Sequence, residues 1–219
     1  NVDVIKQVAR YIRNQRSIFT NTITMTFDDQ RYLPPEPGPD GKIDVTITYL
    51  EMREHPHIAK TTQPLAGHLA VIQARNPTVS FYRFLYHTAG EPWLWYERRS
   101  MDDNTLATLV TNSNVRIYVL YVDGVPAGYV ELDLQVPSDV ELTYFAIFPE
   151  FIGRRLGPWL LQWAVNTAWS GEPERFRVNT CSLDHPKALL IYQQQGFTPY
   201  RQETVRILDP RQLPSWRTP

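Results

Sequence analysis

The sequence predicts a mixed α/β (α+β) fold whose central sheet is antiparallel in its first half and parallel in its second half. Residues 116–122 and 127–134 are expected to form an antiparallel hairpin, because Asp123-Gly124 between them is a strong turn signal. A strand at 140–148 follows, and helix-like and strand-like segments then alternate. The sheet is therefore expected to be flanked by helices.

Residues 1–42 are predicted to form an extension ahead of this domain. The apolar spacing of 1–19 is helix-like, and 22–27 alternate in the manner of a half-buried strand. Another such strand is expected at 43–49. Prolines and glycines at 34–41 exclude regular structure there. This segment is either a long loop across which the two strands pair or a linker.

Two helices are expected between the extension and the hairpin, at 79–87 and 102–111. Asp102 or Asp103 is expected to cap the second helix, because a carboxylate at a helix start accepts hydrogen bonds from free backbone amides. The predicted main domain spans 43–208, and 209–219 form a tail. After the strand at 140–148, the main domain is expected to contain a helix at 156–169, a strand at 176–181, a helix at 187–195 and a final strand near 204–208.

Composition narrows the classes of partner. The chain has 22 basic and 23 acidic residues, so it lacks the basic excess that binding to a phosphate backbone usually requires, and no nucleic-acid partner is expected. No apolar run approaches the length of a membrane span, and the first residues do not resemble a signal peptide, so a cytoplasmic location is expected. The lone Cys181 excludes a cysteine-based metal cluster and is interpreted as a packed core thiol. No metal is expected.

The segment 140–158 predicts an anion-binding site. An apolar strand leads through a loop that contains Gly153, Arg154 and Arg155 into a helix near Gly157. Unpaired N–H groups at a helix start and the positive end of the helix dipole both favour a phosphate, and glycine permits close approach of the backbone. Since many turns carry glycine for geometry alone, this pattern does not decide between a structural and a phosphate-binding loop.

The chain from about Ile43 to Tyr200 resembles the GNAT superfamily of acyl-CoA-dependent N-acyltransferases. The loop is similar to the family pattern Arg/Gln-x-x-Gly-x-Gly, and 185–197 are similar to Asn-x-x-Ala-x-x-x-Tyr-x-x-x-Gly-Phe, with fitting spacing from Ala188 to Phe197. Three positions depart from these patterns. They are Ile152 in place of Arg or Gln, Arg155 in place of the first glycine, and His185 in place of asparagine.

The resemblance implies that acetyl-CoA is the cosubstrate and assigns residues to it. Loop amides are expected to hold the pyrophosphate, the preceding strand is expected to contact the pantetheine through its main chain, and His185 is expected to donate a hydrogen bond to the coenzyme or to a water molecule. Asp184 is alternatively a simple helix cap, with Pro186 in the first turn. The implied coenzyme-binding residues are Phe145, Ala146, Ile147, Gly153, Arg154, Arg155, Leu156, Gly157, Pro158, His185 and Tyr192.

Two side chains are expected to perform the chemistry. Glu141 lies at the position that a general-base glutamate has in the family's histone acetyltransferases, and the alternative is a strand-end acid paired with a nearby lysine or arginine. Glu131 and Asp133 share one predicted sheet face and are rival bases or ligands for a cationic substrate. The resemblance makes Tyr192 the general acid, because its phenol can donate a proton to the departing thiolate; otherwise it is a packing residue.

The acceptor pocket is less defined. Trp93 and Trp95 lie between the two middle helices and are candidates for lining it, although aromatic residues in such a place more often belong to the core. An amino acid, a polyamine, an aminoglycoside-like compound and a protein terminus are all candidate acceptors. A second copy of the chain is a candidate partner through an edge strand.

Two functions therefore follow from the sequence. The first is an N-acetyltransferase that moves acetyl from acetyl-CoA to a primary amine by direct attack in a ternary complex. The second is a non-catalytic module, in which a degenerate pocket binds an acyl-CoA or only a protein. Retention of Glu141, Tyr192 and Gly157 at matching positions favours catalysis.

Overall fold

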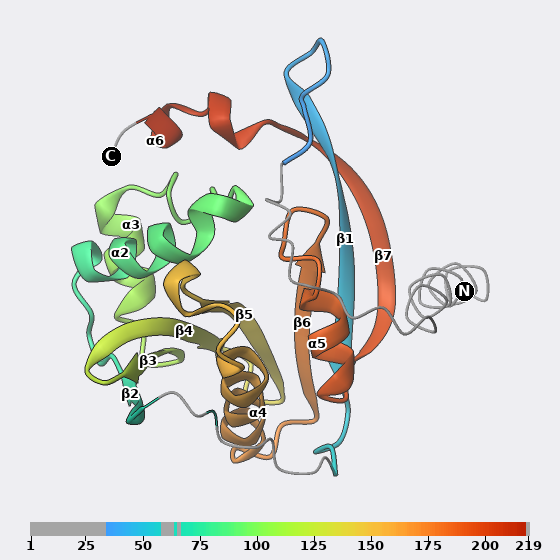
Figure 1. The fold of residues 1–219 in the computed structure, drawn as a ribbon. Helices are drawn as coiled ribbons and strands as arrows, with labels where there is room; N and C mark the ends of the chain where they lie inside the picture. Colours follow the sequence, from blue (N-terminus) through green and yellow to red (C-terminus); the bar gives the residue numbers. More distant parts are fainter. Residues whose placement is uncertain (1–33, 58–63, 65–66, 218–219) are drawn as a thin grey trace.

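The structure, a computed structural model, describes residues 34–57, 64 and 67–217. These residues form a seven-stranded mixed sheet in the order β2-β3-β4-β5-β6-β1-β7 (Figure 1). The strands are β1 Lys42–Met52, β2 Leu69–Gln73, β3 Val115–Val122, β4 Val125–Asp133, β5 Asp139–Ile147, β6 Arg175–Cys181 and β7 Thr198–Leu208. The predicted mixed sheet is confirmed.

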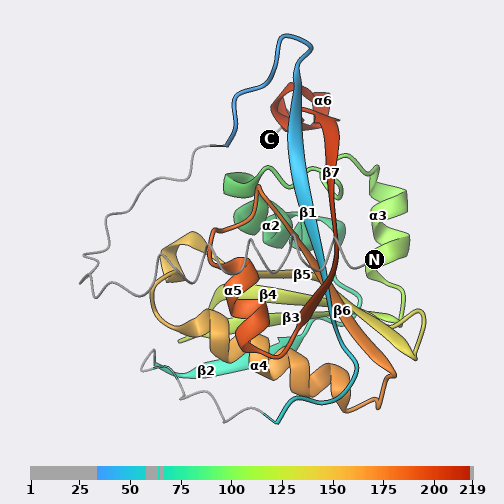
Figure 2. The ribbon, with the colours of Figure 1, turned by 90° about the vertical axis from the view of Figure 1, so that its right-hand side faces the viewer.

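Helices cover both faces of the sheet (Figure 2). The helices are α2 Val79–Gly90, α3 Asp103–Val110, α4 Leu156–Trp169, α5 Ala188–Gln194 and α6 Pro214–Arg217, with short 3-10 turns η1 Glu91–Trp93, η2 Pro149–Phe151 and η3 Pro210–Gln212. One core cluster joins α4 and Tyr192 of α5 to one sheet face, and a second joins α2 and α3 to the other. Apolar residues at helical spacing thus bury both faces.

Most predicted elements are confirmed near their expected positions. The helix predicted at 156–169 is α4, and the predicted hairpin is β3–β4, which turns through Asp123 at φ 50° and Gly124 at φ 84°. The helix predicted at 1–19 and the strand at 22–27 lie outside the described residues. Two elements were not predicted, β2 and α6, and β7 begins well before the expected strand near 204–208.

Strand β1 lies in the middle of the second half of the sheet rather than at an edge. It pairs antiparallel with β6, where Leu50 lies opposite Val178, and antiparallel with β7, where Val45 lies opposite Val205. The sheet is mixed as predicted, but the expectation that its second half is parallel is wrong, because the parallel part of the described sheet is the β5–β6 pair alone. Alternation of apolar residues identifies a strand but not its neighbours, so the sequence could not locate β1.

Strands β5 and β6 pair over only part of their lengths. Asp139–Leu142 pair in parallel with 175–178, whereas beyond this point Tyr144–Ile147 pair with β4 alone and 179–181 pair with β1 alone. The register between β4 and β5 shifts at Leu142, so Thr143 is a bulged residue without an opposite partner. A bulge bends its strand, and the two strands consequently separate. We call the space between their separated ends the β5–β6 gap.

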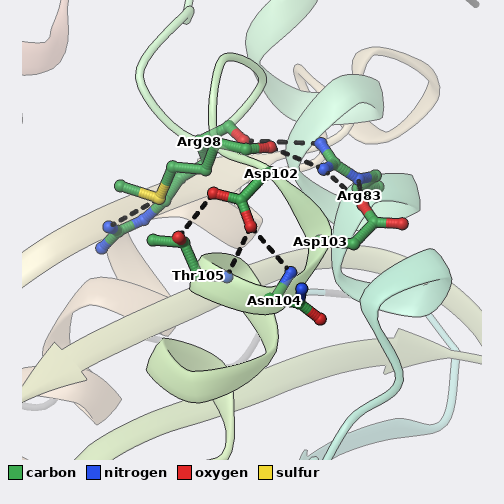
Figure 3. Close-up of polar contacts among 7 residues, drawn as sticks. Arg83, Arg98, Asp102, Asp103, Asn104 and Thr105 are labelled. Carbon is green, nitrogen blue, oxygen red and sulfur yellow. Dashed lines mark hydrogen bonds and ion pairs between the residues drawn. The ribbon is translucent and has the colours of Figure 1, made fainter.

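The loop between α2 and α3 is fastened to both helices (Figure 3). The Asp102 carboxylate accepts hydrogen bonds from the N–H groups of Asn104 and Thr105, each at 3.0 Å, so the predicted cap of α3 is Asp102. Arg83 of α2 donates to the carbonyl of Met101 at 2.8 Å and pairs with Asp103 at 2.7 Å. These contacts fix the course of the loop that precedes α3.

Gly128 marks a close approach between β4 and β5. A Cβ atom at this position would lie 2.3 Å from the carbonyl oxygen of Ala146. We expect Gly128→Ala to lower the free energy of unfolding by about 1–3 kcal/mol, because the backbone of β5 must move, and urea denaturation measures this change. Gly171→Ala is the control, since its Cβ would lie 3.6 Å from the nearest atom. Equal denaturation midpoints for the two variants would contradict the packing described here.

Candidate active site

One wall of the β5–β6 gap is the free edge of β5. Phe148 donates its N–H to the carbonyl of Ala127 on the β4 side at 2.9 Å. Because backbone groups alternate in direction along an antiparallel strand, the N–H groups of Phe145 and Ile147 point away from β4, toward the gap. No described strand pairs with this edge beyond Leu142. It can therefore hydrogen-bond an extended ligand that carries amide groups.

The N-terminus of α4 lies next to the same edge. A Cβ atom at Gly157 would lie 3.8 Å from Ile147 Cγ1, so the first turn of α4 packs against the end of β5. No side chain caps this helix start, which leaves the N–H groups of Leu156 and Gly157 free, while Pro158 has none to offer. Free amides and the helix dipole together suit a phosphate.

The loop before α4 explains one departure from the family pattern. Arg155 is the N-cap of α4 and adopts the left-handed conformation at φ 60°, which glycine adopts with less strain. Gly153 has φ 85°, and a Cβ atom there would meet nothing within 4 Å. Arg154 and Arg155 are exposed, and the Arg154 guanidinium lies 4.7 Å above the ring of Phe151. The loop therefore keeps its backbone geometry and adds two positive charges.

Tyr192 lies on the opposite side of the gap from β5. Its ring is 6.2 Å from that of Phe145 and 5.9 Å from that of Phe197, and its side chain is buried. Burial raises the pKa of the phenol well above its usual value, and the negative charge of Asp184 adds to this effect. Among the described residues no hydrogen-bond partner is found for its hydroxyl group. The phenol is thus protonated and able to donate.

The turn between β6 and α5 is organised by Asp184. This carboxylate accepts hydrogen bonds from Thr180 Oγ1 at 2.8 Å, from the N–H of Cys181 at 2.9 Å and from Trp95 Nε1 at 3.4 Å. The expectation that Asp184 caps the following helix is wrong, because α5 begins after Lys187 and its N-terminus has no side-chain cap. Asp184 instead joins the end of β6 to the aromatic loop.

His185 is a neutral imidazole that can donate a hydrogen bond. Its Nδ1 accepts from the N–H of Lys187 at 3.1 Å, which assigns the ring proton to Nε2. Burial lowers the pKa of the imidazole, and the charge of Lys187 lowers it further. The ring of Trp93 packs against it at 5.4 Å. Neutral His185 can therefore offer an N–H where the family pattern has asparagine.

Glu141 lies at the closed end of the gap, within the paired part of β5. It forms an ion pair with Arg177, its direct neighbour on β6, at 2.8 Å. Glu141 lies opposite Asp133 of β4, and Glu131 is two residues before Asp133 on the same strand. Side chains two residues apart on a strand point to the same face, so Glu131, Asp133 and Glu141 share the sheet face that α2 and α3 cover. Burial raises the pKa of Glu141, whereas the charge of Arg177 lowers it. The net direction is upward, which makes Glu141 a stronger base than an exposed glutamate.

Glu131 and Asp133 already have partners within the protein. Glu131 is fully buried, where it accepts a hydrogen bond from Tyr82 Oη at 2.5 Å and pairs with Arg98 at 2.8 Å. Burial raises its pKa, and the Arg98 charge opposes that rise. Asp133 accepts hydrogen bonds from the backbone and side chain of Gln135, at 2.8 and 2.9 Å. Glu131 is thus paired with a cation, whereas Asp133 is held by neutral hydrogen bonds and forms no ion pair among the described residues.

Glu97, which the sequence does not single out, contacts β5 beside the gap. Its carboxylate accepts a hydrogen bond from Tyr144 Oη at 2.7 Å, and Tyr144 lies on β5 directly after the bulge. The Trp95 ring lies 5.0 Å from that of Tyr144. Glu97 follows the aromatic run 93–96 directly in sequence, but no spacing rule distinguishes it from other exposed acids, so only the contact identifies it.

Neither a metal centre nor a membrane span is found in the part of the chain that the structure describes. No three or more histidine, cysteine or acidic side chains gather there in a way that could hold a metal ion. None of its helices combines the length and the apolar character needed to cross a bilayer.

Comparisons with solved structures agree with this geometry. A GCN5-related N-acetyltransferase from Kribbella flavida aligns with a TM-score of 0.51 at 16% identity, over 78% of this chain and 60% of that chain. A protein from Novosphingobium aromaticivorans assigned to the GNAT family gives 0.51 at 18% identity, over 78% and 68%. A tandem GNAT protein from the clavulanic acid biosynthesis pathway gives 0.51 at 17% identity, over 74% and 53%. At these identities the likeness shows the fold.

The chain covers 53% to 68% of the length of these three structures. No match to a curated protein was found. The model of the acetyltransferase (GNAT) family matches residues 78–197, which is more than half of the 219 residues. That range includes the β5–β6 gap, the start of α4, and Tyr192. This chain belongs to the GNAT acetyltransferase family.

Proposed function

We propose that this protein is an N-acetyltransferase that moves the acetyl group of acetyl-CoA to a primary amine by direct attack in a ternary complex. The observation that carries the proposal is the β5–β6 gap, in which the free N–H groups of Phe145 and Ile147 adjoin the uncapped start of α4. Membership of the family supports the same reaction class. A module that only binds a protein would have no use for this combination.

The residues that line the β5–β6 gap fit both the pantetheine arm and the pyrophosphate of coenzyme A. The free edge of β5 at Ile147 matches an amide group of an extended pantetheine arm. The amides of Leu156 and Gly157, with the exposed Arg154 and Arg155 beside them, suit the pyrophosphate. His185 offers its Nε2–H from the β6–α5 turn, on the other side of the gap. Together these groups bind and orient the coenzyme.

The amine must lose a proton before it can attack. An amine with a pKa near 10.4 is roughly 0.04% neutral at pH 7, a deficit of about 4–5 kcal/mol. We assign Glu141 as the base that accepts this proton, directly or through one water molecule. The support is its raised pKa and its position where β5 and β6 begin to separate.

Acetyl-CoA supplies a thioester carbonyl when it is bound. As the C–N bond forms, the charge on the carbonyl oxygen is stabilised by the N–H of Phe145, which points into the gap. The C–S bond then breaks and the thiolate takes the phenol proton of Tyr192, while the nitrogen of the new amide releases its second proton, which returns Tyr192 to the phenol. Burial keeps that phenol protonated at neutral pH, so Tyr192 is ready to donate in every cycle.

Binding of acetyl-CoA tests the gap directly. Isothermal titration calorimetry should show micromolar binding to the wild-type protein and loss of binding in Gly157→Trp, because the indole would cover the free amides at the start of α4. Gly171→Trp carries the same side chain at an exposed site beyond the end of α4 and should bind as the wild type does. A folded wild-type protein that binds no acetyl-CoA would refute the proposed function.

The catalytic assignments predict separate effects on turnover. With an amine found by screening for thiol release, Glu141→Gln and Tyr192→Phe should each lower kcat by roughly 10²-fold or more while acetyl-CoA still binds. Arg177→Gln should move the acid limb of the kcat/KM profile to higher pH, because the pKa of Glu141 rises further when its positive partner is removed.

Arg206→Gln is the matched control for Arg177→Gln. Arg206 pairs with Asp40 at 3.0 Å on the edge strand β7, away from Glu141, and its loss should leave the acid limb in place. An acid limb that Arg177→Gln leaves unmoved would exclude Glu141 as the base.

A further inference from the structure

Glu97 brings a negative charge to the part of the β5–β6 gap where Tyr144 lies, just beyond the bulge. The carboxylate is bound by Tyr144 of β5. The charge of Glu97 also acts on Cys181, at the end of β6. Burial is the main cause that raises the pKa of this thiol to about 12, and the negative charges of Asp184 and Glu97 contribute to the rise. Glu97 therefore lies near the separated ends of both strands, on the sheet face that α2 covers.

No cation among the described residues forms an ion pair with Glu97, although the Arg98 guanidinium lies 5.3 Å from the centroid of the Tyr144 ring. Arg98, the neighbour of Glu97 in sequence, is turned inward and is paired with the buried Glu131 at 2.8 Å. Cys181 stays an uncharged thiol, because its pKa is about 12. His185 is neutral as well, since burial and Lys187 lower its pKa. The exposed Glu97 accepts one neutral hydrogen bond, from Tyr144, and among the described residues it forms no ion pair.

The side chains beside Glu97 are aromatic and fixed in place. Trp95 packs on the backbone of Gly90, where a Cβ atom would lie 2.5 Å from Trp95 Cβ, and its indole N–H is bound by Asp184. Tyr86 packs against both Trp95 and Tyr144, with ring centroids 5.5 and 5.2 Å apart. Trp95 is only partly buried and so leaves apolar surface next to the carboxylate. A rigid site of this kind loses little entropy when it binds.

We propose that Glu97 is the acceptor-binding residue, which receives the protonated primary amine of a substrate whose adjoining apolar group lies on Trp95. This inference rests on the proposed acetyl transfer and names the acceptor class for it: a primary ammonium attached to an apolar or aromatic group. Glu97 holds the ammonium before the proton leaves for Glu141, and it does not itself take part in the acyl transfer. Tyr144 positions the carboxylate by donating to it.

Phenethylamine is the probe, and 2-phenylethanol is its uncharged counterpart. Calorimetry with the 219-residue protein saturated with coenzyme A should show that phenethylamine binds and that 2-phenylethanol binds at least about tenfold more weakly. Glu97→Gln should weaken phenethylamine binding by about 10- to 100-fold, the range expected for a lost charge-assisted hydrogen bond, and should leave acetyl-CoA affinity within about twofold. Tyr144→Phe should give a smaller loss, because the ring remains while the carboxylate is less well held.

Glu91→Gln is the matched control, since Glu91 is an exposed acid on the neighbouring turn η1 and should have no effect. Equal phenethylamine binding by wild type and Glu97→Gln, equal binding of the two probes, or no phenethylamine binding by the wild type would each overturn the acceptor site. If acetyl-CoA still binds in those cases, the proposed function stands. Failure of acetyl-CoA itself to bind refutes the proposed function instead.

Discussion

The limited pairing between β5 and β6 is the constraint on which the site depends. Two parallel strands that remained paired along their whole lengths would satisfy each other's backbone groups and leave no place for a ligand. The bulge at Thr143 ends this pairing after Leu142 and frees the N–H groups of Phe145 and Ile147. Packing of α4 and α5 on one face and of α2 on the other holds the separated strands in place. The gap is therefore a product of strand register and not of a flexible loop.

Charge divides the gap into regions with different tasks. Positive charge and free amides gather at the start of α4, where Arg154 and Arg155 are exposed. Negative charge gathers on the opposite sheet face, at Glu141 and Glu97. The charges of the buried pair Arg98 and Glu131 cancel each other. Substitution of either residue by alanine would leave the other charge buried and unpaired. Under the proposed function, an anionic coenzyme and a cationic acceptor thus approach the reacting centre from different faces of one sheet.

The sequence predicted the strands that form the hairpin, the helix α4 and a cap at Asp102 or Asp103, because each depends on contacts that are local in the chain. It could not locate β1, since strand order is decided by tertiary packing. A family resemblance made Glu141 and Tyr192 candidate site residues, whereas Glu97 carries no motif and became a candidate only through its contact with Tyr144. Asp184 was misread as a helix cap for a related reason, because its partners at Thr180 and Trp95 come from other elements.

Amide hydrogen exchange, read residue by residue by NMR, tests the central claim most directly. In the free protein the N–H groups of Phe145 and Ile147 should exchange faster than is usual inside a strand, because they point away from β4. The N–H of Ala146 points toward β4, where it is hydrogen-bonded, and should exchange slowly. Coenzyme A should slow exchange at Phe145 and Ile147 by roughly tenfold or more and change Ala146 much less. If coenzyme A binds and the exchange at Phe145 and Ile147 does not change, the β5–β6 gap is not its binding site.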